Sequence, residues 1–128
     1  MYNYAGQNRG SVMIYFGGNG TTNSPDVVIQ GTADFMNLGW NLEKGDADGD
    51  GHDDLLIGSK WSYNAGPPAA GHLGVFLSSA TRYTCSSCSG TQYKTLTVEN
   101  ADLSLNGESA GDQFGSVSAR IWGRVFLK

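Results

Sequence analysis

The sequence predicts an all-β fold, and three observations support this prediction. Glycine makes up 19 of the 128 residues, about twice its usual share, whereas charged residues are only 16% of the chain. Short apolar runs recur along the chain, and glycine-rich turns separate them. No stretch shows a sustained apolar stripe with the period of an amphipathic helix. The length allows one domain at most.

Apolar runs in the first half of the chain predict four strands. The first, residues 10–16, reads Gly-Ser-Val-Met-Ile-Tyr-Phe and is apolar on both faces. A sheet with one solvated face would alternate apolar and polar residues, so we expect this strand in a sheet that is covered on both sides. The other three strands are expected at residues 26–31, 38–42 and 55–58.

The second half of the chain continues this pattern after a proline-containing loop at residues 61–70. The strand expected at residues 73–77 repeats the apolar character of the first strand. Further strands are expected at residues 93–98 and 103–106, and residues 114–117 begin the last segment.

An internal repeat links residues 31–40 with residues 107–116. In each segment a second glycine follows the first after eight positions, and the second glycines, Gly39 and Gly115, define an offset of 76. The strands upstream align at an offset of about 64, so the second unit is longer by about 12. A repeat of about 60 to 76 residues that carries about four short strands has the size of a β-propeller blade.

The loop at residues 46–54 concentrates acidic residues between two expected strands. Two carboxylates about 5 Å apart repel by roughly 3 kcal/mol at an effective dielectric constant of about 20, so such a cluster favours a bound cation. Oxygen ligands at alternate positions suit Ca²⁺ better than Zn²⁺ or Mg²⁺. The predicted ligands are the side chains of Asp46, Asp48, Asp50 and Asp54 and the backbone carbonyl of His52.

Two alternatives to this calcium loop agree less well with the sequence. An EF-hand would need a glutamate at the twelfth position of the loop and helices on both sides, but the twelfth residue is Ile57 and a strand follows. The other alternative is a solvated acidic turn without a metal. The spacing, the turn glycine Gly51 and the strand that follows all favour the metal.

The loop and its flanking strands resemble the FG-GAP repeat. The family pattern is Phe-Gly, a short strand, a Gly-Asp-x-Asp-x-Asp-Gly-x-x-Asp-Leu-Leu-Ile-Gly loop and a Gly-Val-Tyr-Val-Tyr-type strand. The resemblance covers the chain from about Gly6 to Ser118. Two departures stand out. Leu38 replaces the phenylalanine of the Phe-Gly pair, and the counterparts of the three alternating aspartates in the next unit are Trp122, Arg124 and Phe126.

The resemblance implies a partial β-propeller made of four-stranded antiparallel blades. Residues 1–31 would end a preceding blade. Residues 32–106 would form a blade with the calcium loop 46–54 and an insertion that contains the Cys-x-x-Cys sequence. Residues 107–128 would begin the next blade, truncated or divergent.

The resemblance also implies two alternative functions. Phrases such as Asn37 to Leu42 and Leu96 to Ala101 are most similar to the propeller of glycosylphosphatidylinositol-specific phospholipases D, which are secreted. Their Zn²⁺-dependent hydrolysis of the anchor phosphodiester would reside in a separate catalytic domain, so the expected partners are neighbouring blades, that domain and glycosylphosphatidylinositol-anchored proteins. The alternative is an integrin-α-like propeller that binds adhesion ligands and has no enzymatic role.

Several residue types limit the chemistry expected of this chain. Its two histidines, His52 and His72, are too few for a catalytic zinc site, and we expect His72 on the surface. No Gly-x-Ser-x-Gly sequence is present. The net charge of −4 argues against nucleic acid, and no run of about 20 apolar residues predicts a membrane span. The first residues do not resemble a signal peptide, so the chain is either cytosolic or lacks its true N-terminus.

The remaining candidate sites are a cysteine pair, a sequon and three tryptophans. Cys85 and Cys88 predict a local disulfide, with free thiols as the alternative. Asn19 lies in an Asn-Gly-Thr glycosylation sequon, which matters only in a secreted protein. We expect the tryptophans to pack between blades rather than to form a ligand platform; they are Trp40, Trp61 and Trp122.

Overall fold

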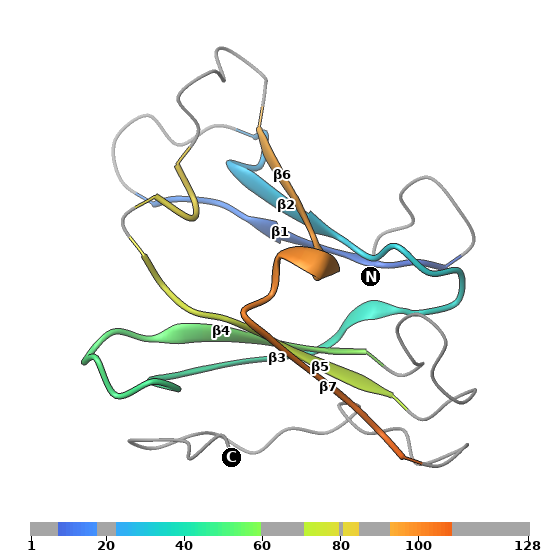
Figure 1. Ribbon diagram of the computed structural model, residues 1–128. Coiled ribbons are helices and arrows are strands. Elements are labelled where there is room, and N and C mark those ends of the chain that lie inside the picture. Colours follow the sequence, from blue (N-terminus) through green and yellow to red (C-terminus); the bar gives the residue numbers. More distant parts are fainter. Residues whose placement is uncertain (1–7, 18–22, 60–70, 80, 85–92, 109–128) are drawn as a thin grey trace.

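The computed structural model describes residues 8–17, 23–59, 71–79, 81–84 and 93–108. In these residues the fold is all-β, with seven strands in two sheets and one short 3-10 helix. Figure 1 shows the two sheets as layers that face each other. Within the described residues, no helix is long and apolar enough to cross a membrane.

One sheet is a four-stranded antiparallel sheet in the order β3-β4-β5-β7. Its strands are β3 (Leu38–Gly45), β4 (Asp54–Ser59), β5 (His72–Phe76) and β7 (Leu103–Asn106). This four-stranded antiparallel sheet agrees with the propeller fragment expected from the sequence.

The second sheet has three strands in the order β1-β2-β6. Its strands are β1 (Ser11–Ile14), β2 (Val27–Gln30) and β6 (Lys94–Thr97). β1 and β2 are antiparallel, whereas β6 lies parallel to β2. Runs of β-branched and leucine residues form the buried strands because they fit a pleated surface that is covered by another layer.

The main hydrophobic core lies between the two sheets. The three-stranded sheet contributes Val12, Val27 and Ile29, and the four-stranded sheet contributes Leu38, Ile57 and Phe76, together with Met36 and Val98. A smaller cluster of Ala47, Leu56 and Val75 packs with partly buried leucines. Each sheet therefore depends on the other for the burial of one apolar face.

The structure contains two equivalent antiparallel strand pairs, β1 with β2 and β5 with β7, which we call the first and second hairpin although β6 lies between β5 and β7 in the sequence. In the first, Ser11 pairs with Gln30; in the second, His72 pairs with Asn106. The β2 and β7 positions keep the offset of 76 expected from the sequence, whereas the β1 and β5 positions have an offset of 61 rather than about 64. The second hairpin therefore has the longer connection. The additional residues lie between β5 and β7 in the sequence, although the two strands pair with each other.

A pair of glycines closes the open end of each hairpin. The Gly31 N–H donates to the Gly10 carbonyl at 3.0 Å, and at the equivalent positions the Gly107 N–H donates to the Gly71 carbonyl at 3.1 Å. Gly10 and Gly71 both have positive φ angles, 78° and 86°. A side chain would be strained at these two positions, which explains why glycine occupies both.

An aspartate closes the other end of each hairpin. The Asp26 carboxylate accepts the Phe16 N–H at 2.6 Å, and the Asp102 carboxylate accepts the Leu77 N–H at 2.8 Å. The same two offsets relate these positions in the sequence. The two hairpins therefore share the same hydrogen bonds at both ends, although the chain between them differs in length.

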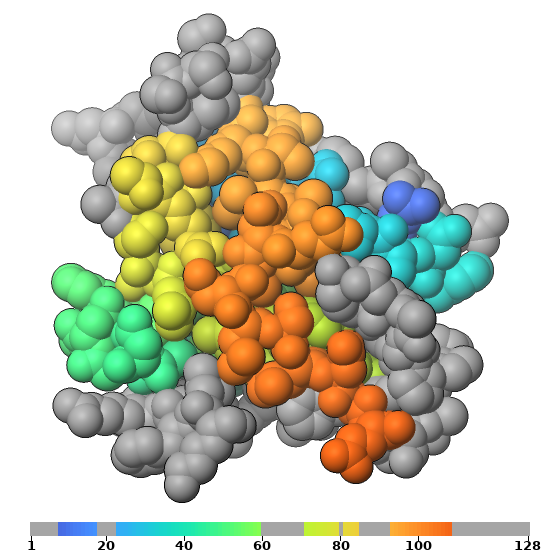
Figure 2. Space-filling view, viewed as in Figure 1, coloured from blue at the N-terminus to red at the C-terminus, as the bar shows by residue number. Residues whose placement is uncertain are grey.

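The segment from β6 to β7 crosses from one sheet to the other. β6 pairs with β2, the 3-10 helix η1 (Val98–Asn100) turns the chain, and β7 then pairs with β5. In Figure 2 the orange residues 93–108 extend over the face shown, from the upper sheet to the lower one. The parallel pairing of β6 with the preceding hairpin was not predicted from the sequence.

The position of His72 corrects one sequence-based expectation. We expected a surface residue, but His72 is 0% exposed. Adjacent positions of a strand face opposite sides, and His72 faces the same side as Gly74 and the core residue Phe76. Burial lowers the pKa of His72 to about 4, because the interior disfavours the charged imidazolium.

Candidate metal centre

The acidic loop connects the antiparallel strands β3 and β4, whose last pair is Gly45 and Asp54. Gly49 and Gly51 have φ angles of 81° and 90°. These angles turn the chain sharply twice within the loop, which a residue with a side chain would do only under strain. The two glycines therefore bring alternate aspartates onto the inside of one turn.

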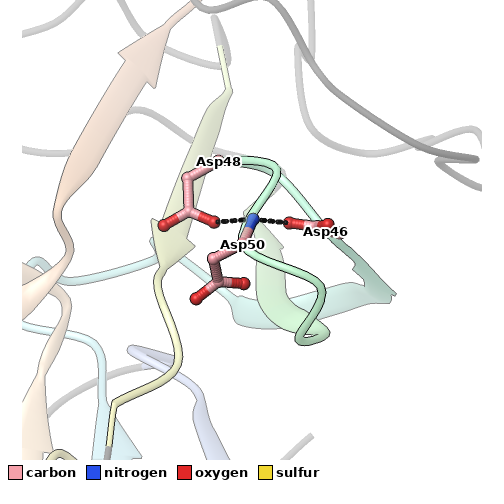
Figure 3. Close-up of side chains that lie close together, drawn as sticks. All are labelled: Asp46, Asp48 and Asp50. Atoms are coloured by element: carbon pink, nitrogen blue, oxygen red, sulfur yellow. Dashed lines mark hydrogen bonds between the residues drawn. The ribbon is translucent and has the colours of Figure 1, made fainter.

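Three of the predicted ligands gather in this loop. One carboxylate oxygen from each of Asp46, Asp48 and Asp50 lies within 4.8 Å of the other two. Figure 3 shows the side chains around the Asp50 backbone N–H, which donates to Asp46 Oδ1 at 3.0 Å and to Asp48 Oδ1 at 3.1 Å. The carboxylates are held in place by the backbone of their own loop.

Asp46 receives the largest number of backbone donors in the loop. Its Oδ2 accepts the Gly51 N–H at 2.9 Å, and its Oδ1 accepts the Gly49 N–H at 2.7 Å in addition to the Asp50 N–H. The hydrogen bond from Gly51, followed by those from Gly49 and Asp50, lowers the pKa of Asp46 against the opposing effect of desolvation. This carboxylate is therefore ionised and available to a cation at neutral pH.

The pKa of Asp48 is shifted in the opposite direction to that of Asp46. The hydrogen bond from the Asp50 N–H lowers its pKa, but desolvation and the negative charges of Asp50 and Asp54 outweigh that bond, so the pKa of Asp48 is raised. After desolvation, repulsion between the carboxylates is the next cause of this upward pKa shift. A cation among them would remove that repulsion.

Asp54 lies outside the group of three and is only 2% exposed. Its Oδ2 accepts the Ala47 N–H at 2.6 Å, and its Oδ1 accepts the Ser78 N–H at 2.8 Å. Each oxygen keeps a second lone pair. Its predicted role as a ligand stays a prediction, and its visible role is to join the loop to the chain that follows β5.

The three gathered carboxylates fit a calcium ion. Ca²⁺ binds oxygen at about 2.3–2.6 Å, so two ligands on opposite sides of one ion are at most about 5.2 Å apart. The group lies within 4.8 Å, below that limit. The donors are all hard carboxylate oxygens, which Ca²⁺ prefers, and carbonyls or water would complete its six to eight ligands.

The other candidate residues have different positions. The His52 N–H donates to Asp50 Oδ1 at 2.8 Å, and its carbonyl stays a predicted ligand. Asp53, which was not assigned as a ligand, instead forms an exposed ion pair with Lys44 at 2.8 Å. The disulfide and glycosylation candidates lie outside the described residues; they are Cys85, Cys88 and Asn19.

Sequence reasoning missed the partners of the loop beyond residue 54. The described residues around a hollow beside it are Asp50, His52, Asp53, Ser78 and Ser79. Nothing in the spacing of the acidic residues points to Ser78, which is 24 positions from Asp54.

The aspartates that close the two hairpins could have been found from the sequence. Asp26 and Asp102 are 76 positions apart, which is the offset of the internal repeat.

The acidic loop and its flanking strands belong to a known class of repeat. Residues 38–75, from the start of β3 to the penultimate residue of β5, match the FG-GAP repeat family model. This range contains the acidic loop and three of the four strands of the antiparallel sheet. The chain therefore carries an FG-GAP repeat within an all-β propeller fragment. Among solved structures, none matches significantly.

The chain is also similar in sequence to named proteins from several mammals. The chain is 36% identical over 108 residues to phosphatidylinositol-glycan-specific phospholipase D of mouse, a match that covers 83% of this chain. The proteins of the same name from rat and human are 34% and 32% identical and cover 83% and 84% of the chain. The chain spans 12% of the length of each of these relatives. It is thus an FG-GAP repeat region homologous to these phospholipases.

Proposed function

We propose that this chain is a calcium-binding propeller segment of a secreted, glycosylphosphatidylinositol-specific phospholipase D-like protein. One observation carries the proposal: three carboxylates gather in the loop between two strands, and backbone N–H groups hold them there. This loop lies within the residues that match the FG-GAP repeat. The segment has a structural role: the ion fixes the β3–β4 hairpin. Hydrolysis of the anchor phosphodiester, with Zn²⁺, belongs to a separate catalytic domain of the whole protein.

The same proposal assigns partners and location. The immediate partners are neighbouring blades and the catalytic domain, and the surface of the whole propeller would contact glycosylphosphatidylinositol-anchored proteins. Millimolar extracellular calcium suits an exposed loop with few protein ligands. The similarity to three phospholipases of one name supports this function over the integrin-like alternative.

We expect calcium to stabilise the chain modestly. Dissociation constants of about 10⁻⁴ to 10⁻³ M are common for extracellular calcium modules. At about 1 mM free calcium, mass action then adds roughly 0.4–1.4 kcal/mol to the free energy of unfolding. Calorimetric titration should detect the binding heat, and thermal melting with calcium or with chelator should detect the stabilisation.

A matched pair of variants tests the ligand assignment. Asp48→Ala removes a ligand oxygen and a charge from the group of three and should abolish both the heat and the melting shift. Asp53→Ala removes a neighbouring charge from an exposed ion pair with Lys44 and should keep both. Asp54→Ala is less informative, because it also leaves two amide donors unpaired. Equal effects of the Asp48 and Asp53 substitutions would contradict the assignment.

We also expect the chain to associate when it is studied alone. β3 is an edge strand of the four-stranded sheet, and two of its apolar side chains, Trp40 and Leu42, are 49% and 48% exposed. In a complete propeller such side chains would pack on a neighbouring blade, and without one they favour association. Sedimentation at micromolar concentration should show oligomers or a loosely packed monomer, and a compact, well-protected monomer would contradict the repeat assignment.

A further inference from the structure

The chain between β5 and β7 forms a connection that the first hairpin lacks. We call its described part the strap; it comprises residues 77–79, 81–84 and 93–102. The strap leaves the four-stranded sheet after β5, adds β6 to the three-stranded sheet in parallel with β2, and returns to β7. Figure 1 shows its returning part, β6 and η1, bridging the two layers.

The outgoing end of the strap is fixed to the acidic loop by one carboxylate. Asp54 accepts the Ser78 N–H of the strap through Oδ1 at 2.8 Å and the Ala47 N–H of the loop through Oδ2 at 2.6 Å. The carboxylate is almost fully buried. Loss of either bond would leave a buried polar group unsatisfied, so the loop and the start of the strap are held in a fixed relation.

The outgoing and returning parts of the strap are fixed to each other. The Arg82 guanidinium donates to the Asn100 carbonyl at 3.0 Å and to the Asp102 carboxylate, and it lies 5.7 Å from the centre of the Phe76 ring. The Lys94 ammonium donates to the Thr81 carbonyl at 2.9 Å. A shift of the outgoing part would therefore change the position of β6.

The last contact is that of β6 with the preceding hairpin. Lys94 to Thr97 pair with Val27 to Gln30, and the Lys94 N–H donates to the Asp26 carbonyl at 3.0 Å. Leu96 packs against the main core. A continuous series of contacts thus runs from the acidic loop through Asp54 and the strap to β2, the middle strand of the three-stranded sheet.

We propose that Asp54 couples cation binding in the loop 46–54 to the docking of β6 on β2. The inference rests on the calcium binding proposed above. Without a cation, the charges of Asp46, Asp48 and Asp50 repel one another and the buried Asp54, which favours movement of the Asp54 carboxylate away from its two amide donors. With a cation bound, the loop charge is compensated and both amide bonds persist, so the strap stays docked.

Hydrogen exchange of the 128-residue chain tests this coupling. Saturating calcium should slow exchange of the segment 93–98 at least about fivefold more than it slows exchange of β1, because a coupling of that size is typical between linked sites. β1 is the internal control, since it lies in the same sheet on the far side of β2. Equal slowing in both segments would mean global stabilisation only and would overturn the coupling.

A variant of Ser78 supplies the reciprocal test. Ser78→Pro removes the N–H that Asp54 accepts without changing the loop, and Ser78→Ala keeps this N–H and serves as the matched control. Because linkage is reciprocal, Ser78→Pro should weaken calcium affinity if Asp54 couples the two events, and an unchanged affinity in this variant would overturn the coupling. Ser78→Ala should leave the affinity unchanged.

The outcomes separate this inference from the proposed function. Calcium heat without selective protection of the segment 93–98 would overturn the coupling and leave calcium binding intact. Absence of calcium heat would overturn both. If Ser78→Pro does not fold, the comparison of β6 with β1 in the unmodified chain still decides the question.

Discussion

Substitution of Gly10 by alanine is expected to lower the free energy of unfolding by about 2–5 kcal/mol, the sum of a conformational and a steric cost. Gly10 has a φ angle of 78°, which costs a residue with a side chain about 1–2 kcal/mol. A Cβ atom there would also lie 2.3 Å from the Leu38 carbonyl oxygen, which belongs to the backbone and cannot rotate away. Forcing an atom into such a site adds about 1–3 kcal/mol.

Three other glycines separate these two causes. A Cβ at Gly31 would lie 2.1 Å from the Arg9 carbonyl oxygen without a positive φ, so its substitution tests the steric term of about 1–3 kcal/mol. Gly51 has a φ of 90° and nothing within 4 Å of a Cβ, so its substitution tests the conformational term of about 1–2 kcal/mol. Gly17 has neither constraint and should tolerate alanine.

Denaturant unfolding of the four alanine variants at one protein concentration gives these free energies. All four should be compared in chelator, so that the Gly51 substitution in the acidic loop is not affected by cation binding. The expected order of destabilisation places Gly10 first and Gly17 last. Similar losses at Gly10 and Gly17 would contradict the close approach of β1 to the start of β3.

Acidification is expected to destabilise the chain through His72. The pKa is lowered from 6.5 to about 4 in the folded chain, so the unfolded chain binds the proton more readily. The stabilising contribution is therefore complete above about pH 6.5 and decreases as the pH falls towards 4. The loss approaches about 1.4 kcal/mol per pH unit and reaches roughly 3.4 kcal/mol at the lower limit.

Measurement of unfolding free energy between pH 7 and 4.5 checks this expectation. His72→Gln removes the titrating group, so its stability should change less with pH, even if the variant is less stable at pH 7. His52→Gln, which changes the exposed histidine of the acidic loop, should retain the pH dependence of the unmodified chain. The same slope in the His72 variant and the unmodified chain would refute the role of His72.

Local patterns were sufficient to predict most of the strands. β7 was expected at residues 103–106 and lies there. Leucines alternate with polar residues in this segment, and a glycine follows it. β3 was expected to end at residue 42 but continues to Gly45, since pairing with β4 extends the hairpin to the edge of the acidic loop. Boundaries of this kind depend on the partner strand, which the local sequence does not specify.

Non-local contacts limited the rest of the prediction. β6 was expected as a strand, yet its parallel pairing of Val27 with Lys94 joins residues that are distant in sequence. His72, at the start of an expected strand, was expected on the surface rather than as a metal ligand. The alternation of His72, Gly74 and Phe76 already placed it on the face of a buried aromatic residue, and atoms of His72 and Phe76 both lie 3.3 Å from a Cβ placed on Gly74.

The candidate metal centre was predicted in part. The spacing of Asp46, Asp48 and Asp50 placed three carboxylates on one turn, and the structure brings these three together. The same spacing predicts Asp54 as a further ligand, which stays a prediction; the structure shows that β4 begins at this residue and that its side chain is buried. The donor from Ser78 comes from another part of the chain and leaves no local signal.

The matched closure of the two hairpins makes the far end of this unit a natural insertion point. The connection from the paired Val75 to Leu103 is more than twice as long as the connection from the paired Ile14 to Val27. Loop-closure entropy grows only with the logarithm of length, so the longer connection costs about 0.7 kcal/mol more. We therefore expect the first hairpin to tolerate a peptide or small domain inserted between Phe16 and Asp26 at a similarly small cost. The hydrogen bonds of Asp26 with Phe16 and of Gly31 with Gly10, which close the two ends of the hairpin, would not be interrupted by the insertion.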